Sequence, residues 1–361
     1  MRLCAMPVFV LWSVLCSPTS ADVVLRNGQV LTGPVDAVSA AGVAIGGEAS
    51  RTIGWDVVYF VTGEHSTEAE EYRAWSDTVW RAKTRLSRGD LMLASPMFDD
   101  LFERVERDGI GGPTGLLVAE GALRCRVANS DHGGAVDAWI YALAIRETGQ
   151  RLSGESATSG VIDAQTMLVP SLPPIWLEDS EDARRLMRLP FEEPGAGASP
   201  IDGLIYLYQR NAAQSLGVEF SGRRDFGTVR MGPGASIVAS ISQSQSVEPS
   251  ERRTAREELQ LLIDQHPGTW KEAWARVAIG RSLLRESSDA ERDRGMLHLL
   301  HAPARFSRSQ PHLSAIALAE VGREAIRRGD HTTADQIRAE LAERYSKHPA
   351  GAWLDRHVSS D

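Results

Sequence analysis

Two segments of this chain begin with the same tripeptide and then keep the same spacing of apolar residues. Both start Arg-Gly-Asp, at residues 88–105 and 328–345, so they lie 240 residues apart. Each has an alanine at the fourth position after the aspartate, Ala94 or Ala334, and then a leucine, Leu101 or Leu341. Self-similarity of this kind indicates a repeated structural unit, and it is weighed before any short motif.

Helical periodicity surrounds both tripeptides. Around the first one, apolar residues recur at steps of three and four over residues 72–86 and again over 91–105. The central glycine permits the left-handed turn that ends one helix, and the aspartate can cap the next. Thr67 and Glu70 have the spacing of a capping box for the first helix. The pattern therefore predicts antiparallel helices joined by a tight corner, which explains RGD better than an exposed adhesive loop does.

The spacing resembles the tetratricopeptide repeat (TPR), a helix-turn-helix unit of about 34 residues. Arg338 departs from that pattern, which usually has an aromatic residue there. Weaker copies have corners at Ser130-Asp131 and Ser287-Ser288. The resemblance implies a mainly α fold, in which TPR-like hairpins stack as an α-solenoid. The residues that carry it are Gly89-Asp90, Ala94, Phe98 and Leu101 in the first unit, and Leu318, Val321-Gly322, Ala325, Gly329-Asp330, Ala334 and Pro349 in the last.

The first residues have the features of a secretory signal peptide. Arg2 precedes an apolar stretch over residues 3–15, and small residues follow before a predicted cut after residue 21. The stretch is too short for a permanent membrane span. A lipid anchor on Cys16 is disfavoured because Leu15 is bulky where a small residue is normally needed. We therefore expect residues 1–21 to be removed and the protein to be exported, periplasmic or extracellular, with no integral membrane segment.

Residues 22–62 follow a different pattern. β-branched runs and turn signals such as Asn27-Gly28 predict four or five short strands. We expect a small β-barrel-like domain that resembles SH3-like or Sm-like barrels, with Trp55, Tyr59 or Phe60 docked on the first helix as a cap. Sm-like barrels often bind RNA, but the net charge of −9 and the expected export oppose nucleic acid as a partner.

Domain boundaries follow the changes of pattern along the rest of the chain. Residues 218–248 fit a helix opened by Pro233, a strand or a mobile segment, and the sequence does not decide between them. Trp176, flanked by prolines, is expected to pin its loop onto the domain. The expected organisation is TPR-like helical hairpins over 63–147, a Pro/Gly-rich linker with a possible short helix over 148–200, and a second TPR-like helical region over 201–358.

The sequence contains no familiar catalytic motif. Gly-x-Ser-x-Gly, His-Glu-x-x-His, the phosphate loop and the dinucleotide fingerprint are all absent. The best metal candidates, His298, His301 and His312, are better explained by packing near a helix end. Cys125 remains alone after the signal peptide, so it is expected to be a structural thiol. The acid pairs Asp99-Asp100 and Glu192-Glu193 fit solvated charge better than paired catalytic carboxylates.

These patterns predict a protein without catalytic, cofactor or metal-binding residues. The expected function is an exported, non-catalytic protein–protein interaction scaffold, which binds a protein or peptide partner on its TPR-like helical surface. The alternative is an extracytoplasmic enzyme, a hydrolase of unrecognised type with a site between the helices. A hollow in which histidines and carboxylates converge would favour the enzyme.

Overall fold

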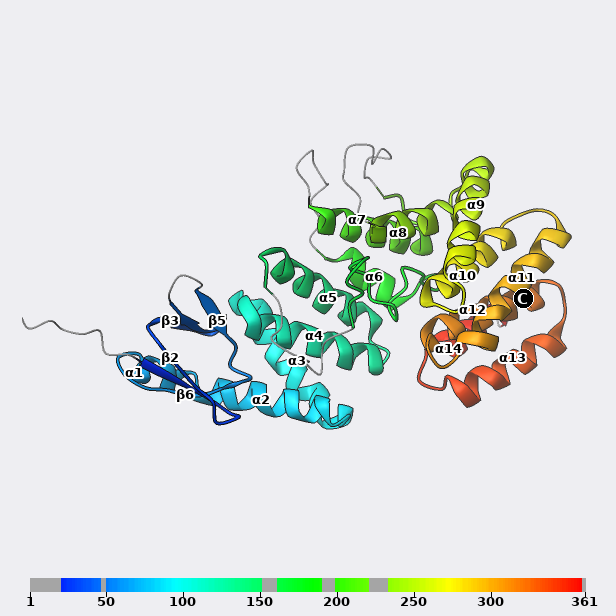
Figure 1. Cartoon of the computed structure of the whole chain (residues 1–361). Helices are drawn as coiled ribbons and strands as arrows, with labels where there is room; N and C mark the ends of the chain where they lie inside the picture. The colour runs from blue at the N-terminus through cyan, green and yellow to red at the C-terminus, as the bar shows by residue number, and fades with distance from the viewer. Residues whose placement is uncertain (1–20, 47–49, 151–160, 190–198, 221–232, 359–361) are drawn as a thin grey trace, which may run out of the picture. The chain divides into compact units, whose positions relative to one another are not determined.

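The computed structural model describes residues 21–46, 50–150, 161–189, 199–220 and 233–358 (Figure 1). Residues 1–20, which hold nearly all of the predicted signal peptide, lie outside these ranges. The chain divides into an N-terminal unit, up to Arg81 with residues 110–114, and a C-terminal unit of residues 82–109 and the chain after Thr114. The fold is mainly α with a small antiparallel β region. Within the described ranges, no helix combines the length and the apolar character needed to cross a bilayer.

The β region of the N-terminal unit consists of two three-stranded antiparallel sheets, ordered β2-β1-β6 and β3-β4-β5. The predicted hairpin at Asn27-Gly28 is confirmed, because Val24 pairs with Val30 and Gly28 has a φ of 85°. The described strands do not close into one barrel, in contrast to the barrel-like domain expected from the sequence. The strands are β1 Ala21–Leu25, β2 Val30–Gly33, β3 Val35–Ser39, β4 Gly42–Ile45, β5 Arg51–Ile53 and β6 Val58–Val61.

A buried tryptophan connects the sheets of the N-terminal unit to its helices, α1 (Ser66–Glu71) and α2 (Arg73–Ser87). Trp55 is 2% exposed and stacks on Tyr72, between the two helices, with ring centroids 5.5 Å apart. Its indole N–H donates to the carbonyl of Ser39 at 2.7 Å. Trp55 therefore packs where the sequence places an aromatic cap, whereas Tyr59 and Phe60 are exposed.

The capping box predicted at Thr67 and Glu70 is wrong. The first helix begins at Ser66, so Thr67 lies inside it, and the cap residue His65 makes no side-chain capping bond. Tyr72 then interrupts the helical run before α2 begins. Thr67 and Glu70 have the S/T-x-x-E spacing, but both lie inside the helix and neither occupies a capping position.

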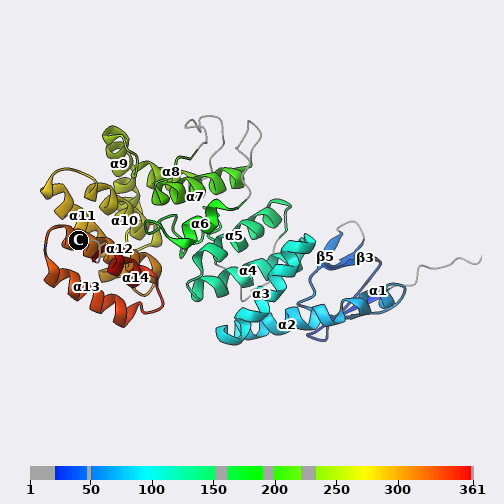
Figure 2. The same cartoon turned by 180° about the vertical axis from the view of Figure 1, so that it is seen from behind.

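The regular structure described for the C-terminal unit is helical. Phe98 of α3 lies against Gly121 of α4, and Arg146 of α5 bonds to Glu120 of α4. From α5 to α14, each helix contacts the next one along the chain (Figures 1 and 2). The helices are α3 Leu91–Asp108, α4 Gly112–Ala128, α5 His132–Glu147, α6 Glu181–Met187, α7 Pro200–Leu216, α8 Pro233–Gln243, α9 Pro249–Gln265, α10 Trp270–Leu284, α11 Asp289–Phe306, α12 Pro311–Arg327, α13 His331–Arg344 and α14 Ala350–Val358.

Three helix corners share one backbone geometry. Gly89, Ser130 and Gly329 have left-handed φ angles of 77°, 63° and 74°. In each corner, the N–H of the following aspartate donates to the carbonyl five residues earlier, at 3.0, 2.9 and 2.9 Å. This is the bond of a Schellman helix end. The corners predicted at both RGD segments and at Ser130-Asp131 are therefore confirmed.

The aspartates of these corners differ in how they cap the next helix. Asp131 accepts a hydrogen bond from the backbone N–H of Gly134, and Asp330 accepts one from Thr333, each at 3.0 Å. Asp90 makes no such bond, and its carboxylate pairs with Arg85 at 3.4 Å instead. The predicted aspartate cap is thus confirmed at two corners and wrong at the first.

Glycines allow close approach between neighbouring helices of the C-terminal unit. A methyl carbon at Gly121 in α4 would lie 2.0 Å from the ring of the fully buried Phe98 in α3. On α10 and α11, Gly280 and Gly295 face each other, and a methyl carbon on either would lie 2.9 Å from the carbonyl oxygen of the other. Any larger side chain at these positions would push the helices apart.

Residues 161–180 have no helix or strand, yet they belong to the core. The sequence predicts a linker over 148–200. Residues 151–160 and 190–198 lie outside the described ranges, but Leu168, Leu172 and Trp176 are at most 1% exposed. Side chains from four helices donate to carbonyls of this segment, so its backbone is satisfied without secondary structure. The bonds are Trp139 to Met167 at 2.9 Å, Tyr208 to Leu172 at 2.8 Å, Trp274 to Pro170 at 3.0 Å and Trp353 to Glu178 at 2.8 Å.

Two further expectations for the middle of the chain can be compared with the structure. The possible short helix is present as α6, and Trp176 packs inside the domain as expected. Part of the undecided stretch 218–248 is helical, because α8 begins at Pro233. Residues 221–232 lie outside the described ranges.

Candidate functional site

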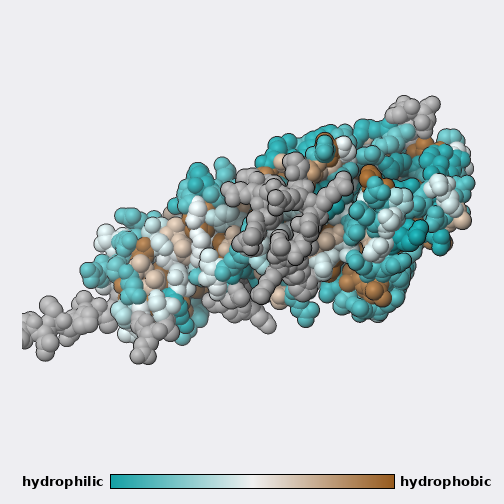
Figure 3. All heavy atoms as spheres, turned by 90° about the horizontal axis from the view of Figure 1, so that it is seen from above, coloured by the Kyte–Doolittle hydropathy of each residue, from teal (hydrophilic) through white to brown (hydrophobic). Residues whose placement is uncertain are grey.

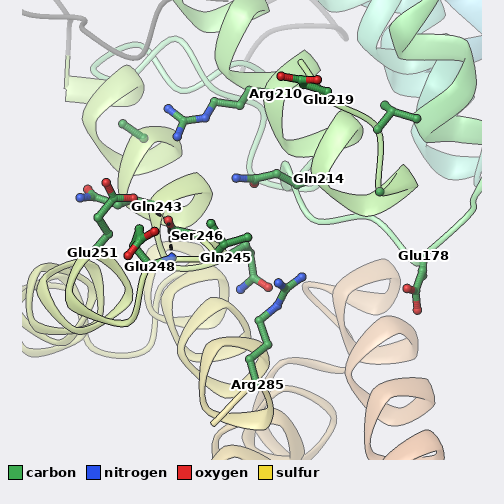
Figure 4. Close-up of a pocket in the computed structure, with 14 residues that line it drawn as sticks. Glu178, Arg210, Gln214, Glu219, Gln243, Gln245, Ser246, Glu248, Glu251 and Arg285 are labelled. Atoms are coloured by element: carbon green, nitrogen blue, oxygen red, sulfur yellow. Dashed lines mark hydrogen bonds between the residues drawn. The ribbon is translucent and has the colours of Figure 1, made fainter. Parts of the chain in front are cut away.

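A hollow of about 720 Å³ lies in the C-terminal unit, and its lining residues are mostly polar or charged, with Gly217, Val218, Ala239 and Val247 among them (Figure 4). Helix α7 contributes Arg210 and Gln214, which are four residues apart and so share one helix face. The α8–α9 connection contributes Gln245 and neighbouring residues, and Arg285 comes from the C-terminal end of α10. Gln214, Gln245 and Arg285 point into the same space in Figure 4. The site is therefore built from segments about 75 residues apart in sequence.

The two glutamines at the centre of the hollow are held in place by the backbone around them. Gln214 donates to the carbonyl of Ser242 at 3.3 Å and accepts from the hydroxyl of the same residue at 3.4 Å. Gln245 donates to the carbonyl of Ala278 at 3.4 Å and to Ser244 at 3.2 Å. Both amides are thus fixed before any ligand arrives, which reduces the entropy lost on binding.

A buried arginine fixes the rim next to them. Arg252 of α9 donates to the carbonyls of Ser246 and Val247 at 3.1 and 3.0 Å. Its guanidinium also forms a two-bond pair with Glu286, at 3.2 and 3.1 Å, and Arg256 donates to the same carboxylate at 2.7 Å. Two arginines therefore use the carboxylate of Glu286, which adjoins Arg285 in the sequence.

A second group of charges lies beyond Arg285, toward α12. Glu320 is 1% exposed and forms ion pairs with Arg281 at 3.1 Å and Arg323 at 2.6 Å. Arg323 also pairs with Glu178 at 2.6 Å. Burial raises the pKa of Glu320, but the neighbouring arginines, Arg323 first, outweigh it and hold that pKa below its usual value. The carboxylates on this side are thus also occupied.

Arg285 is left without a carboxylate. Within the described ranges, its side chain makes no hydrogen bond and no ion pair, although water reaches it. Burial by the surrounding protein lowers the pKa of Arg285, and the nearby Arg281, Arg252 and Arg323 lower it further, against the opposing effect of Glu320. A guanidinium with five donors and no acceptor is a ready site for a carboxylate or another planar anion.

The opposite side of the hollow carries negative charge. Glu248 and Glu251 lie near the start of α9, on the other side of the hollow from Glu178 in Figure 4. The hydroxyl of Ser246 donates to Glu251 and accepts from the backbone N–H of Glu248 at 3.2 Å, so it stabilises this turn. A ligand that fits both sides has a carboxylate toward Arg285 and a cationic or polar end toward α9.

The metal candidates named from the sequence do not form one site. His301 bonds to Glu272 at 3.1 Å, and burial first, then Arg276, lowers the pKa of the neighbouring His298 to about 4. His312 lies against His132 and His348 instead. In the part of the chain that the structure describes, no group of three or more His, Cys, Asp or Glu side chains has the arrangement needed to hold a metal ion.

The other sequence candidates lie apart from the hollow. Cys125 is buried, and burial raises the pKa of its thiol to about 11, as expected for a structural thiol. Asp99 pairs with Arg126 at 3.0 Å, whereas Asp100 is exposed. The pair Glu192-Glu193 lies outside the described residues.

The sequence did not predict the hollow, because its main feature is an arginine side chain that has no carboxylate partner among the described residues of the folded chain. Arg285 stands in "SLLRESSDAER", where charges of both signs alternate as on any solvated helix end. The one available signal was "SISQSQS", a polar run with two glutamines that the pattern left undecided between a strand and a mobile segment.

The structure is that of a mainly helical protein with a small antiparallel β region and a hollow whose lining includes Arg210 and Arg285. Comparisons with protein-family models, curated proteins and solved structures found no match to this chain. On the face seen in Figure 3, hydrophilic residues predominate and apolar ones form separate small groups.

Proposed function

We propose that this protein is an exported, non-catalytic scaffold of the TPR-like α-solenoid type, and that the polar hollow binds an extended peptide segment of a partner protein. The unpaired Arg285 carries this proposal. The sequence of residues 1–21 supports the export, and the three matching helix corners support the repeat character. Each of these supports is independent of the others.

A carboxylate is the proposed anchor of the peptide. Beside the hollow, the carboxylates of Glu178, Glu286 and Glu320 pair with Arg252, Arg256, Arg281 and Arg323, and none of them pairs with Arg285, which lines the hollow. An acidic side chain or a peptide C-terminus would supply the missing partner of Arg285. Because Arg285 is reached by water, the pair would stabilise the complex modestly, by about a tenfold change in Kd.

The fixed glutamines supply the second part of the recognition. Primary amides donate and accept, as peptide groups do. Gln214 keeps one N–H for a ligand carbonyl, and the amide oxygens of Gln214 and Gln245 can accept from the main-chain N–H groups of an extended ligand. Gln243, at the end of α8, lines the same hollow. Main-chain contacts give affinity with little dependence on sequence, and the carboxylate at Arg285 would add the selectivity.

The experiment is a peptide microarray of random heptamers probed with the labelled protein, followed by fluorescence polarisation on the best binders. Each binder is measured as three versions: unchanged, with its acidic residue replaced by the amide, and with an amidated C-terminus. Arg285→Gln is compared with the wild type. Arg308→Gln is the matched control, because Arg308 is exposed and does not line the hollow.

We expect binders enriched in a carboxylate at one position, with about tenfold weaker binding for Arg285→Gln and unchanged binding for the control. Binding that ignores both the carboxylate and Arg285 would refute the anchor but leave peptide binding standing. Absence of any binder that competes for the hollow would refute the proposed function itself.

A further inference from the structure

Three histidines from distant parts of the C-terminal unit meet in one cluster. His132 is the first residue of α5, His312 is the second residue of α12, and His348 precedes α14. The rings of His132 and His312 stack with centroids 3.5 Å apart and an interplanar angle of 26°. His312 Nδ1 lies 2.8 Å from His348 Nε2. This cluster borders a separate hollow of about 410 Å³ and takes no part in the proposed peptide site.

The hydrogen bonds determine which nitrogens carry protons. The backbone N–H of Ala350 donates to His348 Nδ1 at 3.1 Å, so this nitrogen has no proton. A neutral His348 therefore carries its proton on Nε2 and donates it to His312 Nδ1. His132 Nδ1 lies 3.1 Å from the carbonyl oxygen of Ser130, which can only accept, so Nδ1 is the protonated nitrogen there. The two bonds of His348, from Ala350 and to His312, are satisfied only when both rings are neutral.

An additional proton would be unfavourable on each of the three rings. On His348 it would occupy Nδ1 and face the N–H of Ala350, the first residue of α14. On His312, whose Nε2 is buried and has no hydrogen-bond partner in the described residues, it would occupy Nδ1 and face the N–H of His348. On His132 it would place a positive charge against the stacked ring of His312. Each of these arrangements is repulsive.

The charged groups around the cluster do not offset such a charge. His132 is adjacent to Asp131, which pairs with Arg185 of α6 at 3.5 Å. Asp182 accepts a hydrogen bond from the backbone N–H of Gly133, and Arg126 donates to the carbonyl of Gly134. On the other side of the cluster, Arg344 and Lys347 border the hollow together with Tyr345. The carboxylates thus lie on the α5–α6 side only, and the α13–α14 side is basic.

We propose that this cluster is an acid-sensitive latch, in which the neutral rings hold the start of α5 against the starts of α12 and α14, and protonation separates them. The device goes beyond the proposed peptide binding and would control the C-terminal end of the helical array.

The titration behaviour of the rings sets the pH range of the latch. Burial lowers the pKa of His132 to about 4, despite the opposing effects of the Ser130 carbonyl and Asp131. Burial and His132 lower the pKa of His348 to about 3, and burial with both neighbouring rings holds that of His312 far below its usual value. An opened histidine titrates near pH 6.5. The open state therefore holds more protons below that pH, so the latch is at full strength above pH 6.5 and weakens as the pH falls toward 4.

The test is hydrogen exchange of the full chain at pH 7.5 and pH 5.0, with uptake corrected for the intrinsic exchange rate. Peptides covering residues 348–357 and 310–316 should open more at the lower pH, by up to about tenfold per pH unit for each histidine that titrates. His348→Asn should reduce this dependence, because an asparagine oxygen can still accept from Ala350 but does not titrate. His331→Asn is the control, since His331 is exposed at the start of α13.

The latch is refuted if protection of residues 348–357 is equal at the two pH values, or if His348→Asn leaves the dependence unchanged. Should that variant fail to fold, the pH titration of the imidazole Cε1–H signals of the wild-type protein is followed by NMR instead. Three signals that do not titrate above pH 6 support the latch. An ordinary titration of the His312 ring would overturn it.

Discussion

Replacing Gly121 by alanine should destabilise the C-terminal unit, although alanine is the better helix former. The added methyl carbon would lie 2.0, 2.4 and 2.5 Å from three ring carbons of Phe98. Non-bonded carbons normally approach to about 3.5 Å, so the ring would have to move by roughly 1.5 Å. Phe98 is fully buried, so either its ring leaves its place or α3 and α4 separate.

Two opposing effects set the size of the loss in unfolding free energy. Alanine gains about 1 kcal/mol over glycine in a helix interior. Overpacking typically costs about 1–3 kcal/mol, and removing a buried phenylalanine side chain costs about 3–5 kcal/mol. The overlap at Gly121 is too deep for small adjustments, so the cost should be close to about 3 kcal/mol. The expected net destabilisation is therefore about 2 kcal/mol.

Urea unfolding followed by far-UV circular dichroism measures this loss. Gly351→Ala in α14 is the matched control, because no atom lies within 4 Å of its added methyl carbon, and it should stabilise by about 0.5–1 kcal/mol. In a Phe98→Ala background the cost of Gly121→Ala should disappear. A Gly121→Ala variant as stable as the wild type, or a loss that persists without the Phe98 ring, would contradict the α3–α4 packing described above.

Three further predictions concern the caps, the buried charges and the core segment, and urea unfolding measures each of them. Asp131→Ala should lower the free energy of unfolding by about 1 kcal/mol, because it removes a capping hydrogen bond. Asp90→Ala removes no capping bond and should cost clearly less. Equal losses would contradict the difference between the two corners. Glu320→Gln removes a buried carboxylate from two partly exposed arginines, Arg281 and Arg323, and should cost about 3 kcal/mol or less at pH 7. The pKa of Glu320 is lowered in the fold, so its contribution to the free energy of unfolding is present above the unfolded pKa near 4.5 and is lost as the pH falls through the folded pKa. The stabilities of the wild type and the variant should therefore converge in acid. A difference in stability that does not change with pH would count against the ion pair. Trp274→Phe removes the indole donor from the buried carbonyl of Pro170 and should cost about 1–3 kcal/mol, and a neutral result would show that water replaces the bond.

The helix corners could be predicted from the sequence because their causes are local. A left-handed residue after an apolar helical run, followed by an aspartate, requires no information from beyond about ten residues. Even Ser130, which is not a glycine, was identified as a corner through its neighbour Asp131, and its φ is 63°. The failure at Thr67 is also local, since a capping-box spacing does not say which residue begins the helix.

The core segment and the polar hollow could not be predicted because both depend on distant partners. Prolines at 170, 173 and 174 remove backbone donors, so residues 161–180 resemble a linker in isolation. Their burial becomes favourable only because Trp274 and Trp353 supply donors from 104 and 175 residues further along the chain. Arg285 is a candidate because Glu178, Glu286 and Glu320 pair with other arginines, and those pairs can be known only from coordinates.

The long reach of those tryptophans has a consequence for how the protein is made. An array whose units touch only their neighbours can fold in steps as it leaves the ribosome. Here the carbonyls of Pro170 and Glu178 receive their donors only from α10 and α14, which are synthesised 104 and 175 residues later, so this segment remains incompletely ordered until α14 has been made. Such high contact order slows folding, and C-terminally truncated chains should be trapped in a protease-sensitive state.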